Sequence, residues 1–220
     1  MVRIPHSMEV IPGINCEEEK CVKERFEIAR HLSCTWLHVD VSDGVFANSR
    51  TWNTPETFAH APAKLEIHLM VMNPEDVIEK WLTIGAKRII VHVESFQAKK
   101  ESIFLNIVTI CKNFGAELML SANPETEIEA FMPYKDIVSS FQLLAVLPGL
   151  SGQEFDVAII NKIKVLKGRI PNAIIEIDGG VNPIVAKKVF DVGATIISVS
   201  SYIFTSDNPS QAYTTLQQIL

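Results

Sequence analysis

The sequence lacks long apolar runs, low-complexity segments and linkers rich in Pro, Gly or Ser. No stretch approaches the ~20 apolar residues that a membrane-spanning helix needs, and the start, MVRIPHSMEV, has no apolar run like that of a signal peptide. Because no linker marks a boundary, we expect one domain over residues 1–220. We expect a cytoplasmic protein with no membrane partner.

The sequence also has fewer basic than acidic residues. The chain has 20 Lys and Arg against 26 Asp and Glu, which gives a formal net charge of −6 at pH 7. This balance argues against a broad nucleic-acid-binding surface, so we expect no nucleic acid partner. It does not exclude a small phosphorylated substrate, because a few backbone amides can hold a phosphate group locally.

Cysteine is sparse, and its spacing matches no common motif. The four cysteines form no Cys-x-x-Cys pair; they are Cys16, Cys21, Cys34 and Cys111. This pattern favours free thiols in a reducing compartment over a disulfide framework or a cysteine–zinc site.

What the chain does contain is a recurring unit, in which a short β-branched run precedes an amphipathic stretch. The candidate strands are residues 9–14, 36–41, 65–71, 88–93, 117–121, 137–146, 174–178 and 195–199. The candidate helices are residues 18–31, 55–60, 74–84, 100–114, 125–132, 156–167, 183–192 and 209–220. Eight alternations favour an α/β fold, a single (β/α)8 TIM barrel. An open doubly wound sheet is the alternative, because periodicity alone does not show closure.

Several of the predicted helices have recognisable ends. Asn73, Asn182 and Asn208 each precede a proline, which suits an N-cap followed by proline at the first helical position. Gly85 and Gly115 follow helical patterns and suit a left-handed C-terminal cap.

Ionisable side chains gather where the predicted strands end. In LHVDVSDG, residues 37–44, one strand face holds His38, Asp40 and Ser42, because successive side chains alternate between faces. His68 stands in the next strand, and Asp178 ends the seventh. The active site of such a barrel lies at the carboxyl ends of its strands, which is where these residues fall.

Two imidazoles and two carboxylates can bind one divalent metal ion, zinc, iron or manganese. Taken singly, each of the four residues is better explained as a hydrogen-bonded core histidine or a capping carboxylate. Together they favour a metal site, because buried carboxylates without a cation are unfavourable. His92 either orients a metal ligand or satisfies a backbone carbonyl. Glu94 is most simply a solvated charge at a strand end.

Glycine-rich loops follow the sixth and seventh strands, and a serine pair follows the eighth. Barrels of this kind commonly hold phosphate at the loops after strands seven and eight, although glycines mark ordinary turns as well. We assign substrate or phosphate binding to Gly149, Ser151, Gly152, Gly179, Gly180, Ser200 and Ser201.

In this order, the segments resemble the ribulose-phosphate 3-epimerase family over nearly the whole chain. HVDVSDG is similar to the family's His-x-Asp-x-Met-Asp-Gly segment, and IHLMV is similar to its His-Leu-Met strand. IVHVES, SANPETE, LPGLSGQ and IEIDGGVN follow in the family's order. The resemblance implies a (β/α)8 barrel that interconverts D-ribulose 5-phosphate and D-xylulose 5-phosphate. It also implies a small phosphorylated ketose as substrate and a homo-oligomer.

The resemblance further implies that His38, Asp40, His68 and Asp178 hold the metal. Asp40 and Asp178 would also be the paired acid and base. Inverting a carbon beside a ketone requires removing a proton from one face and returning one to the other, so a carboxylate must stand on each side. Met70 would belong to an apolar cap over the intermediate.

Several positions depart from the family pattern. Ser42 and Leu144 replace methionines of the apolar cap, and Leu147 replaces a glutamate before Pro-Gly. IPGINCEE replaces Pro-Ser-x-Leu-Ser-x-Asp, and we expect Asn15 to take the part of a substrate-binding serine. Ser200-Ser201 replaces Gly-Ser, so the added side chain at position 200 is expected to displace the phosphate or reshape its pocket. These departures concern the ketose phosphate that binds rather than the reaction.

Two other functions are alternatives. Aldol or decarboxylation chemistry on the same barrel would require a strand that ends Asp-x-Lys-x-x-Asp, and this chain has no lysine after Asp40. A former epimerase could serve as a non-catalytic binding or scaffold protein, although grouping two buried aspartates with two histidines argues against that. Trp52 caps a substrate, lines a subunit contact or simply packs.

Overall fold

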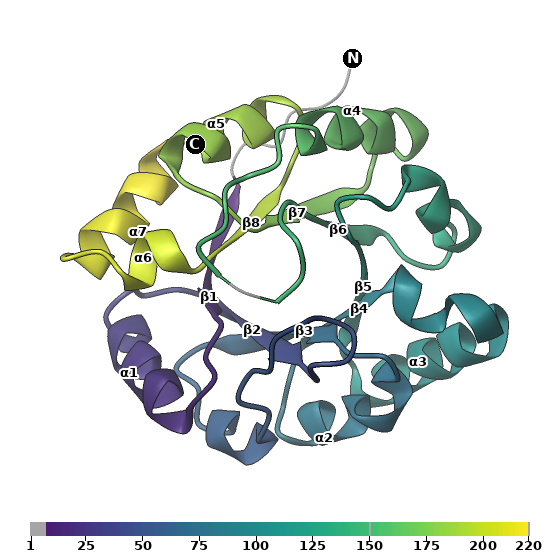
Figure 1. Ribbon diagram of the computed structural model, residues 1–220, viewed down its shortest axis with the longest axis horizontal. Helices are drawn as coiled ribbons and strands as arrows, with labels where there is room; N and C mark the ends of the chain where they lie inside the picture. The colour runs from purple at the N-terminus through teal and green to yellow at the C-terminus, as the bar shows by residue number, and fades with distance from the viewer. Residues whose placement is uncertain (1–7, 150, 220) are drawn as a thin grey trace.

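Eight parallel strands close into a barrel in which each strand pairs with its neighbour in chain order and β8 pairs back with β1 (Figure 1). The structure is a computed structural model that describes residues 8–149 and 151–219, and for residues 97–100 the backbone alone. The strands are β1 (Glu9–Ile14), β2 (Trp36–Ser42), β3 (Lys64–Met70), β4 (Arg88–His92), β5 (Glu117–Ala122), β6 (Ser140–Leu144), β7 (Ile174–Asp178) and β8 (Ile196–Val199). The predicted (β/α)8 barrel is confirmed, and the open sheet is excluded.

Helices surround the barrel as an outer ring (Figure 1). The α-helices are α1 (Glu19–Arg30), α2 (Ile78–Thr83), α3 (Lys100–Phe114), α4 (Ile159–Arg169), α5 (Pro183–Asp191), α6 (Ser201–Phe204) and α7 (Pro209–Gln218). The 3-10 helices are η1 (Pro55–Phe58), η2 (Pro74–Asp76), η3 (Val93–Lys99) and η4 (Ile128–Tyr134). None of the helices in the described ranges is both long enough and apolar enough to cross a membrane.

Two of the predicted helices, residues 55–60 and 125–132, are 3-10 rather than α-helical. Each is short, and η4 contains Pro133, which cannot donate a backbone hydrogen bond. A third, residues 74–84, divides into η2 and α2. That all of residues 1–220 form one domain stays a prediction, because the described part does not include both ends.

The predicted helix ends are largely confirmed. The Asn182 side chain accepts hydrogen bonds from two backbone amides of α5, and the Asn208 side chain accepts one from α7. Asn73 precedes η2 but makes no such bond with its side chain. Gly85 and Gly115 have φ angles of +99° and +65°, the left-handed conformation expected of C-terminal caps.

The barrel lumen has an apolar layer below a polar one. The apolar cluster consists of Ile11, Trp36, Ile90, Met119 and Ile196, each from a different strand. Each of these stands two residues before an inward-facing position nearer the strand end, and side chains two apart share a face. The apolar layer therefore fills the lumen towards the start of the strands, and the polar groups lie at the carboxyl end.

Candidate active site

Four side chains from three strands meet at the carboxyl end of the barrel. They are His38 and Asp40 from β2, His68 from β3 and Asp178 from β7, and one ligand atom of each lies within 4.8 Å of all the others. Asp40 Oδ1 lies 3.2 Å from His38 Nε2 and 3.0 Å from His68 Nδ1. Asp178 Oδ2 lies 3.7 and 3.4 Å from the same two nitrogens. We call these four residues the acid–base cluster.

The donor set of the acid–base cluster suits a divalent metal ion. Two imidazole nitrogens and two carboxylate oxygens are ligands that zinc, iron and manganese all accept. Both histidine side chains are fully buried, and the two carboxylate side chains are only 10% and 14% exposed. The residues present therefore fit a metal, and nothing in this set selects one of the three ions.

The second ring nitrogen of His38, Nδ1, contacts two buried glutamates outside the acid–base cluster. His38 Nδ1 lies 2.8 Å from Glu66 Oε1 and 3.5 Å from Glu176 Oε1. Arg88 Nη1 donates to the other oxygen of Glu66, and Arg88 Nε donates to Glu117 at 2.9 Å. Because Glu66 accepts from His38 Nδ1, a neutral His38 would present its Nε2 lone pair to a metal in the acid–base cluster.

The second nitrogen of His68 is held by a different chain of contacts. His68 Nε2 lies 2.8 Å from His92 Nε2, and His92 Nδ1 lies 3.3 Å from Glu94 Oε2. Glu94 also accepts from the Asn123 amide at 2.9 Å and from the Thr126 hydroxyl. His92 thus orients a predicted ligand, which was one of its two expected roles. The expectation that Glu94 is a solvated charge is wrong, because it anchors this chain of bonds and is largely buried.

These contacts shift several pKa values. Burial lowers the pKa of His38, but its hydrogen bonds to Asp40 and Glu66 outweigh burial and raise it well above the ordinary value. Burial likewise opposes a raised pKa at His68, where Asp178 and Asp40 prevail. Burial tends to raise the pKa of Asp40, but its bonds to both histidines hold it well below the usual range. In the metal-free cluster these contacts favour protonated imidazoles at His38 and His68 beside an ionised Asp40.

Glu176 is a buried carboxyl group that sequence reasoning missed. Burial, reinforced by Glu66, raises its pKa to about 8. Its Oε1 accepts from Gln142 Nε2 at 3.0 Å, whereas Oε2 has no hydrogen-bond partner. Period two could have revealed both acids, because Glu66 stands two residues before His68 and Glu176 two before Asp178.

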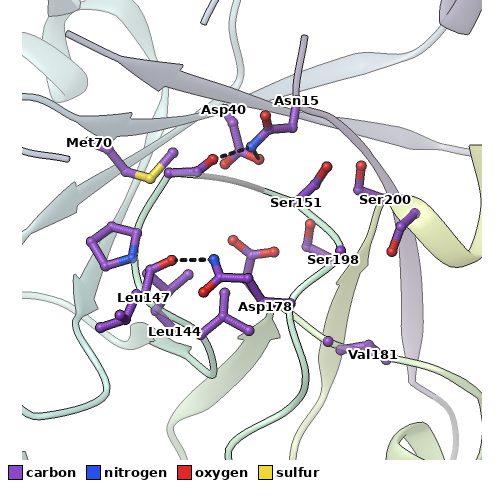
Figure 2. Close-up of a pocket in the computed structure, with 18 residues that line it drawn as sticks. Asn15, Asp40, Met70, Leu144, Leu147, Ser151, Asp178, Val181, Ser198 and Ser200 are labelled. Carbon is purple, nitrogen blue, oxygen red and sulfur yellow. Dashed lines mark hydrogen bonds between the residues drawn. The ribbon is translucent and has the colours of Figure 1, made fainter. Parts of the chain in front are cut away.

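One pocket opens above the acid–base cluster, and all the predicted substrate residues line it (Figure 2). Asp40 and Asp178 reach into it from strands on different sides of the barrel (Figure 2). Asn15 Nδ2 donates to Asp40 Oδ2 at 2.9 Å and to the Gly149 carbonyl at 2.8 Å. The other predicted residues along its wall are Met70, Ser151, Gly152, Gly179, Gly180, Ser200 and Ser201.

Two of the glycines are needed for close approach. A Cβ at Gly149 would lie 2.5 Å from Ser49 Oγ, and a Cβ at Gly180 would lie 2.4 Å from the Phe155 backbone nitrogen. Both positions also have positive φ, which favours glycine. At these two positions the wall of the pocket therefore has no room for a side chain.

The departures from the family pattern have distinct structural consequences. Leu144 and Leu147 line the pocket. Ser42 does not; its hydroxyl donates to the Ser49 carbonyl at 2.6 Å and fastens the loop after β2. Trp52 is half-buried, packs against the core and donates to Thr57 Oγ1 at 3.1 Å. Trp52 thus packs within the chain and is not among the residues that line the pocket, and a subunit contact at Trp52 stays a prediction.

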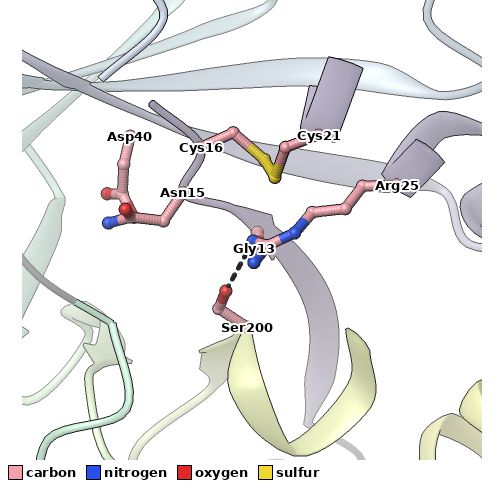
Figure 3. The surroundings of a disulfide bond; sticks show 7 residues. All are labelled: Gly13, Asn15, Cys16, Cys21, Arg25, Asp40 and Ser200. Atoms are coloured by element: carbon pink, nitrogen blue, oxygen red, sulfur yellow. Dashed lines mark hydrogen bonds between the residues drawn. A yellow bond between two sulfur atoms is a disulfide. The ribbon is translucent and has the colours of Figure 1, made fainter. Parts of the chain in front are cut away.

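The side chain at position 200 faces a glycine. Ser200 Oγ accepts from Arg25 Nη1 at 3.0 Å, and Arg25 Nη1 also donates to the Gly13 carbonyl at 3.2 Å (Figure 3). A Cβ at Gly13 would lie 3.4 Å from Ser200 Cβ. Gly13, on β1, therefore leaves room for the serine after β8. Of these residues only Ser200 lines the pocket. We call Gly13, Arg25 and Ser200 the anion end, because the sequence analysis expects phosphate at Ser200.

The expectation of free thiols is wrong for two of the four cysteines. Cys16 and Cys21 form a disulfide, with a Cα–Cα distance of 5.8 Å (Figure 3). Cys16 follows β1 and Cys21 lies in the first turn of α1, so the turn between them brings the two together. Cys34 and Cys111 are free. The spacing alone could not show this pairing, and it no longer supports a reducing compartment.

Comparison with known proteins identifies the family. Residues 9–204 match the sequence profile of the Ribulose-phosphate 3 epimerase family. The chain belongs to this family. It is 31% identical over 215 residues to the ribulose-phosphate 3-epimerase of Chlamydia pneumoniae, which covers 92% of this chain and 90% of that protein. It is 30% identical over 193 residues to the cytoplasmic isoform from Oryza sativa subsp. japonica, covering 85% and 83% of the two chains.

A solved structure supports the same barrel. The 3-hexulose-6-phosphate synthase from Salmonella typhimurium superposes with a TM-score of 0.74 at 11% identity, covering 97% of this chain and 98% of that one. At such low identity the likeness shows the fold alone. The ribulose-phosphate 3-epimerase relatives confirm the predicted class, an isomerase of the sugar-phosphate epimerase type.

Proposed function

We propose that this protein is a metal-dependent epimerase that inverts C3 of a ketose phosphate, either ribulose 5-phosphate and xylulose 5-phosphate or a related sugar phosphate. The observation that carries the proposal is the placement of Asp40 and Asp178. They come from strands separated around the barrel, reach one pocket and contact the same two imidazoles. An acid–base pair that works on two faces of one carbon needs this arrangement.

In the proposed reaction, one carboxylate removes the C3 proton and the other donates a proton to the opposite face. In the reverse direction the two aspartates exchange roles. The Asn15 amide donates to Asp40 Oδ2 and orients that oxygen at the pocket. Both histidines contact the other oxygen, Oδ1, which fixes the carboxylate within the acid–base cluster.

His38 Nε2, His68 Nδ1 and the two carboxylates are the groups that would hold the metal. When bound, a divalent ion supplies positive charge where the enediolate develops negative charge. Glu66 and His92 orient the two imidazoles from outside the cluster, and such supporting bonds raise metal affinity. Met70 and Leu144 form an apolar wall of the pocket.

The experiment is an epimerisation assay on metal-loaded and metal-free protein, with D-ribulose 5-phosphate and other ketose phosphates, followed by NMR. We expect conversion at C3 by the metal-loaded protein and loss of activity when a chelator removes the metal. Failure to convert any ketose phosphate, in protein shown by elemental analysis to hold one metal per chain, would overturn the proposal.

A non-catalytic binding or scaffold protein is the second candidate, favoured by the changed residues at the anion end. For such a protein, Asp40→Asn would leave its partner binding unchanged, and no metal would be required. The homo-oligomer and the cytoplasmic location stay predictions. Light scattering of the purified protein tests the first, and fractionation of the source cells tests the second.

A further inference from the structure

Arg25 is a partly buried residue whose guanidinium bonds a residue of the pocket wall, Ser200. It lies on α1, and its Nη1 bonds Ser200 Oγ and the Gly13 carbonyl (Figure 3). Its Cζ lies 5.0 Å from the centre of the Phe204 ring, which covers another side of the group. The contacts come from β1, the residue before α6 and α6 itself, so the side chain is held from several elements.

The charge of Arg25 is not balanced by a bonded carboxylate. Of the ion pairs found among residues 8–149 and 151–219, none includes Arg25, whereas Arg30 on the same helix pairs with Glu27. Burial lowers the pKa of Arg25, and the charge of Asp40 opposes this. A guanidinium nonetheless stays protonated in proteins, and a partly desolvated charge favours an anionic partner.

Ser200 connects this charge to the pocket. Ser200 lines the pocket, and its oxygen accepts from Arg25. Within the described part of the chain no acceptor takes the Ser200 hydroxyl proton, so that proton is available to a ligand. A hydroxyl that accepts from a cation is a stronger donor, because the bonds polarise one another.

We propose that Arg25 adds a positive charge to the subsite at Ser200, where the phosphate group of the substrate is already expected. Ser200 contacts the phosphate, and Arg25 is a positioning residue that acts through it. This inference rests on the proposed function, because it assigns the phosphate end of the same ketose phosphate. It adds a full positive charge to a site for which the sequence predicted serines and glycine-loop amides without one.

Such a charge has a physical reason here. The helix beside the site, α6, has four residues, too few for a substantial helix dipole. Arg25 also stands four residues after Cys21, so both lie on one face of α1. The disulfide to Cys16 ties that face to the end of β1 and holds Arg25 beside Gly13 (Figure 3).

The first test is calorimetric titration of metal-free protein with inorganic phosphate. We expect Arg25→Gln to weaken phosphate binding at least tenfold, with Arg25→Lys in between because it keeps the charge. Ser200→Ala should weaken binding as well. The matched control is Arg30→Gln, which makes the same charge change on the same helix at an exposed ion pair and should bind phosphate as the wild type does.

The second test is kinetic. In metal-loaded protein, Arg25→Gln should raise KM for the ketose phosphate more than it lowers kcat. Wild-type phosphate affinity in folded Arg25→Gln and Arg25→Lys would overturn the inference even if the enzyme is an epimerase. Arg25-dependent phosphate binding without turnover of any ketose phosphate would overturn the proposed function and leave the subsite standing.

Discussion

The two ends of the pocket differ in how they relate to the family. In the acid–base cluster, His38, Asp40, His68 and Asp178 are the residues that the family resemblance predicts, and buried chains of bonds fix each imidazole. At the anion end the chain departs from the pattern that the resemblance predicts. Ser200 stands where that pattern has glycine, and Arg25 contacts both Ser200 and Gly13.

The difference reflects what each end must do. Proton transfer on two faces of a carbon depends on carboxylates within hydrogen-bond reach, and a small displacement would stop it. An anion can be held by several combinations of amides, hydroxyls and cations. The acid–base cluster therefore tolerates little change, whereas the anion end can exchange residues as long as their sizes and charges compensate.

The largest effect is expected at the acid–base cluster. Asp40→Asn and Asp178→Asn each remove a proton carrier and a metal ligand, so kcat should fall by about 10²–10⁴-fold or more. Steady-state kinetics, with metal content measured on the same samples, checks this. Wild-type kcat in either variant would show that the aspartate concerned is not required for proton transfer, which contradicts the role given to the acid–base cluster.

The next largest effect is expected from the hydrogen bond between Glu66 and His38 Nδ1. Glu66→Gln weakens the acceptor for His38 Nδ1, and metal affinity should fall by about 10–100-fold. Glu117→Gln is the matched control, because Glu117 bonds the same Arg88 but is 59% exposed. Competition with a metal chelator measures both. Equal affinities in the two variants would show that the buried chain of bonds does not tune the cluster.

Removing the Cys16–Cys21 disulfide tests whether it positions Arg25 at the anion end. Cys16 and Cys21 close a short loop, for which chain entropy gives a stabilisation of about 2 kcal/mol. Cys16→Ser should lower Tm by roughly 4–8 °C for a chain of this size. It should also weaken phosphate binding, because Arg25 loses its tether. Cys34→Ser, at a free cysteine, is the control for both readouts.

The smallest expected effect is on the pH dependence of stability. His38, His68 and Glu176 have raised pKa values, so each of them binds more protons in the folded metal-free protein than in the unfolded chain, whereas His92, whose pKa burial lowers, opposes them. Stability from the three groups with raised pKa values is full below their unfolded pKa values and is lost as pH rises through the folded ones. We expect at least about 1 kcal/mol less stability at pH 8.5 than at pH 6, roughly 2–4 °C in Tm.

Metal binding should reverse this trend, because the ion replaces the protons and high pH favours its ligands. Thermal melts of metal-loaded and metal-free protein at the two pH values provide the comparison. A metal-free protein that gains stability as pH rises would contradict the proton assignment.

Much of the fold was readable in the sequence because strand and helix periodicities are local. Glu9–Ile14 and Ile174–Asp178 have the predicted limits. The acid–base cluster was readable because period two places His38 and Asp40 on one face, and the barrel brings His68 and Asp178 to them. The roles of Glu94 and Arg25 were not readable, because their partners are remote: Glu94 bonds Thr126, and Arg25 bonds Ser200. The Cys16–Cys21 disulfide depended on a turn geometry that no spacing rule specifies.

The most direct measurement of the central claim is the isotope content of C3 after a reaction in D2O. Metal-loaded protein is mixed with D-ribulose 5-phosphate, and the sugar phosphates are examined by NMR before equilibrium. Two carboxylates on opposite faces predict an epimer that contains solvent deuterium at C3, since the proton returned comes from a different group from the one that took the first. An epimer that keeps its original hydrogen at C3 would contradict the account.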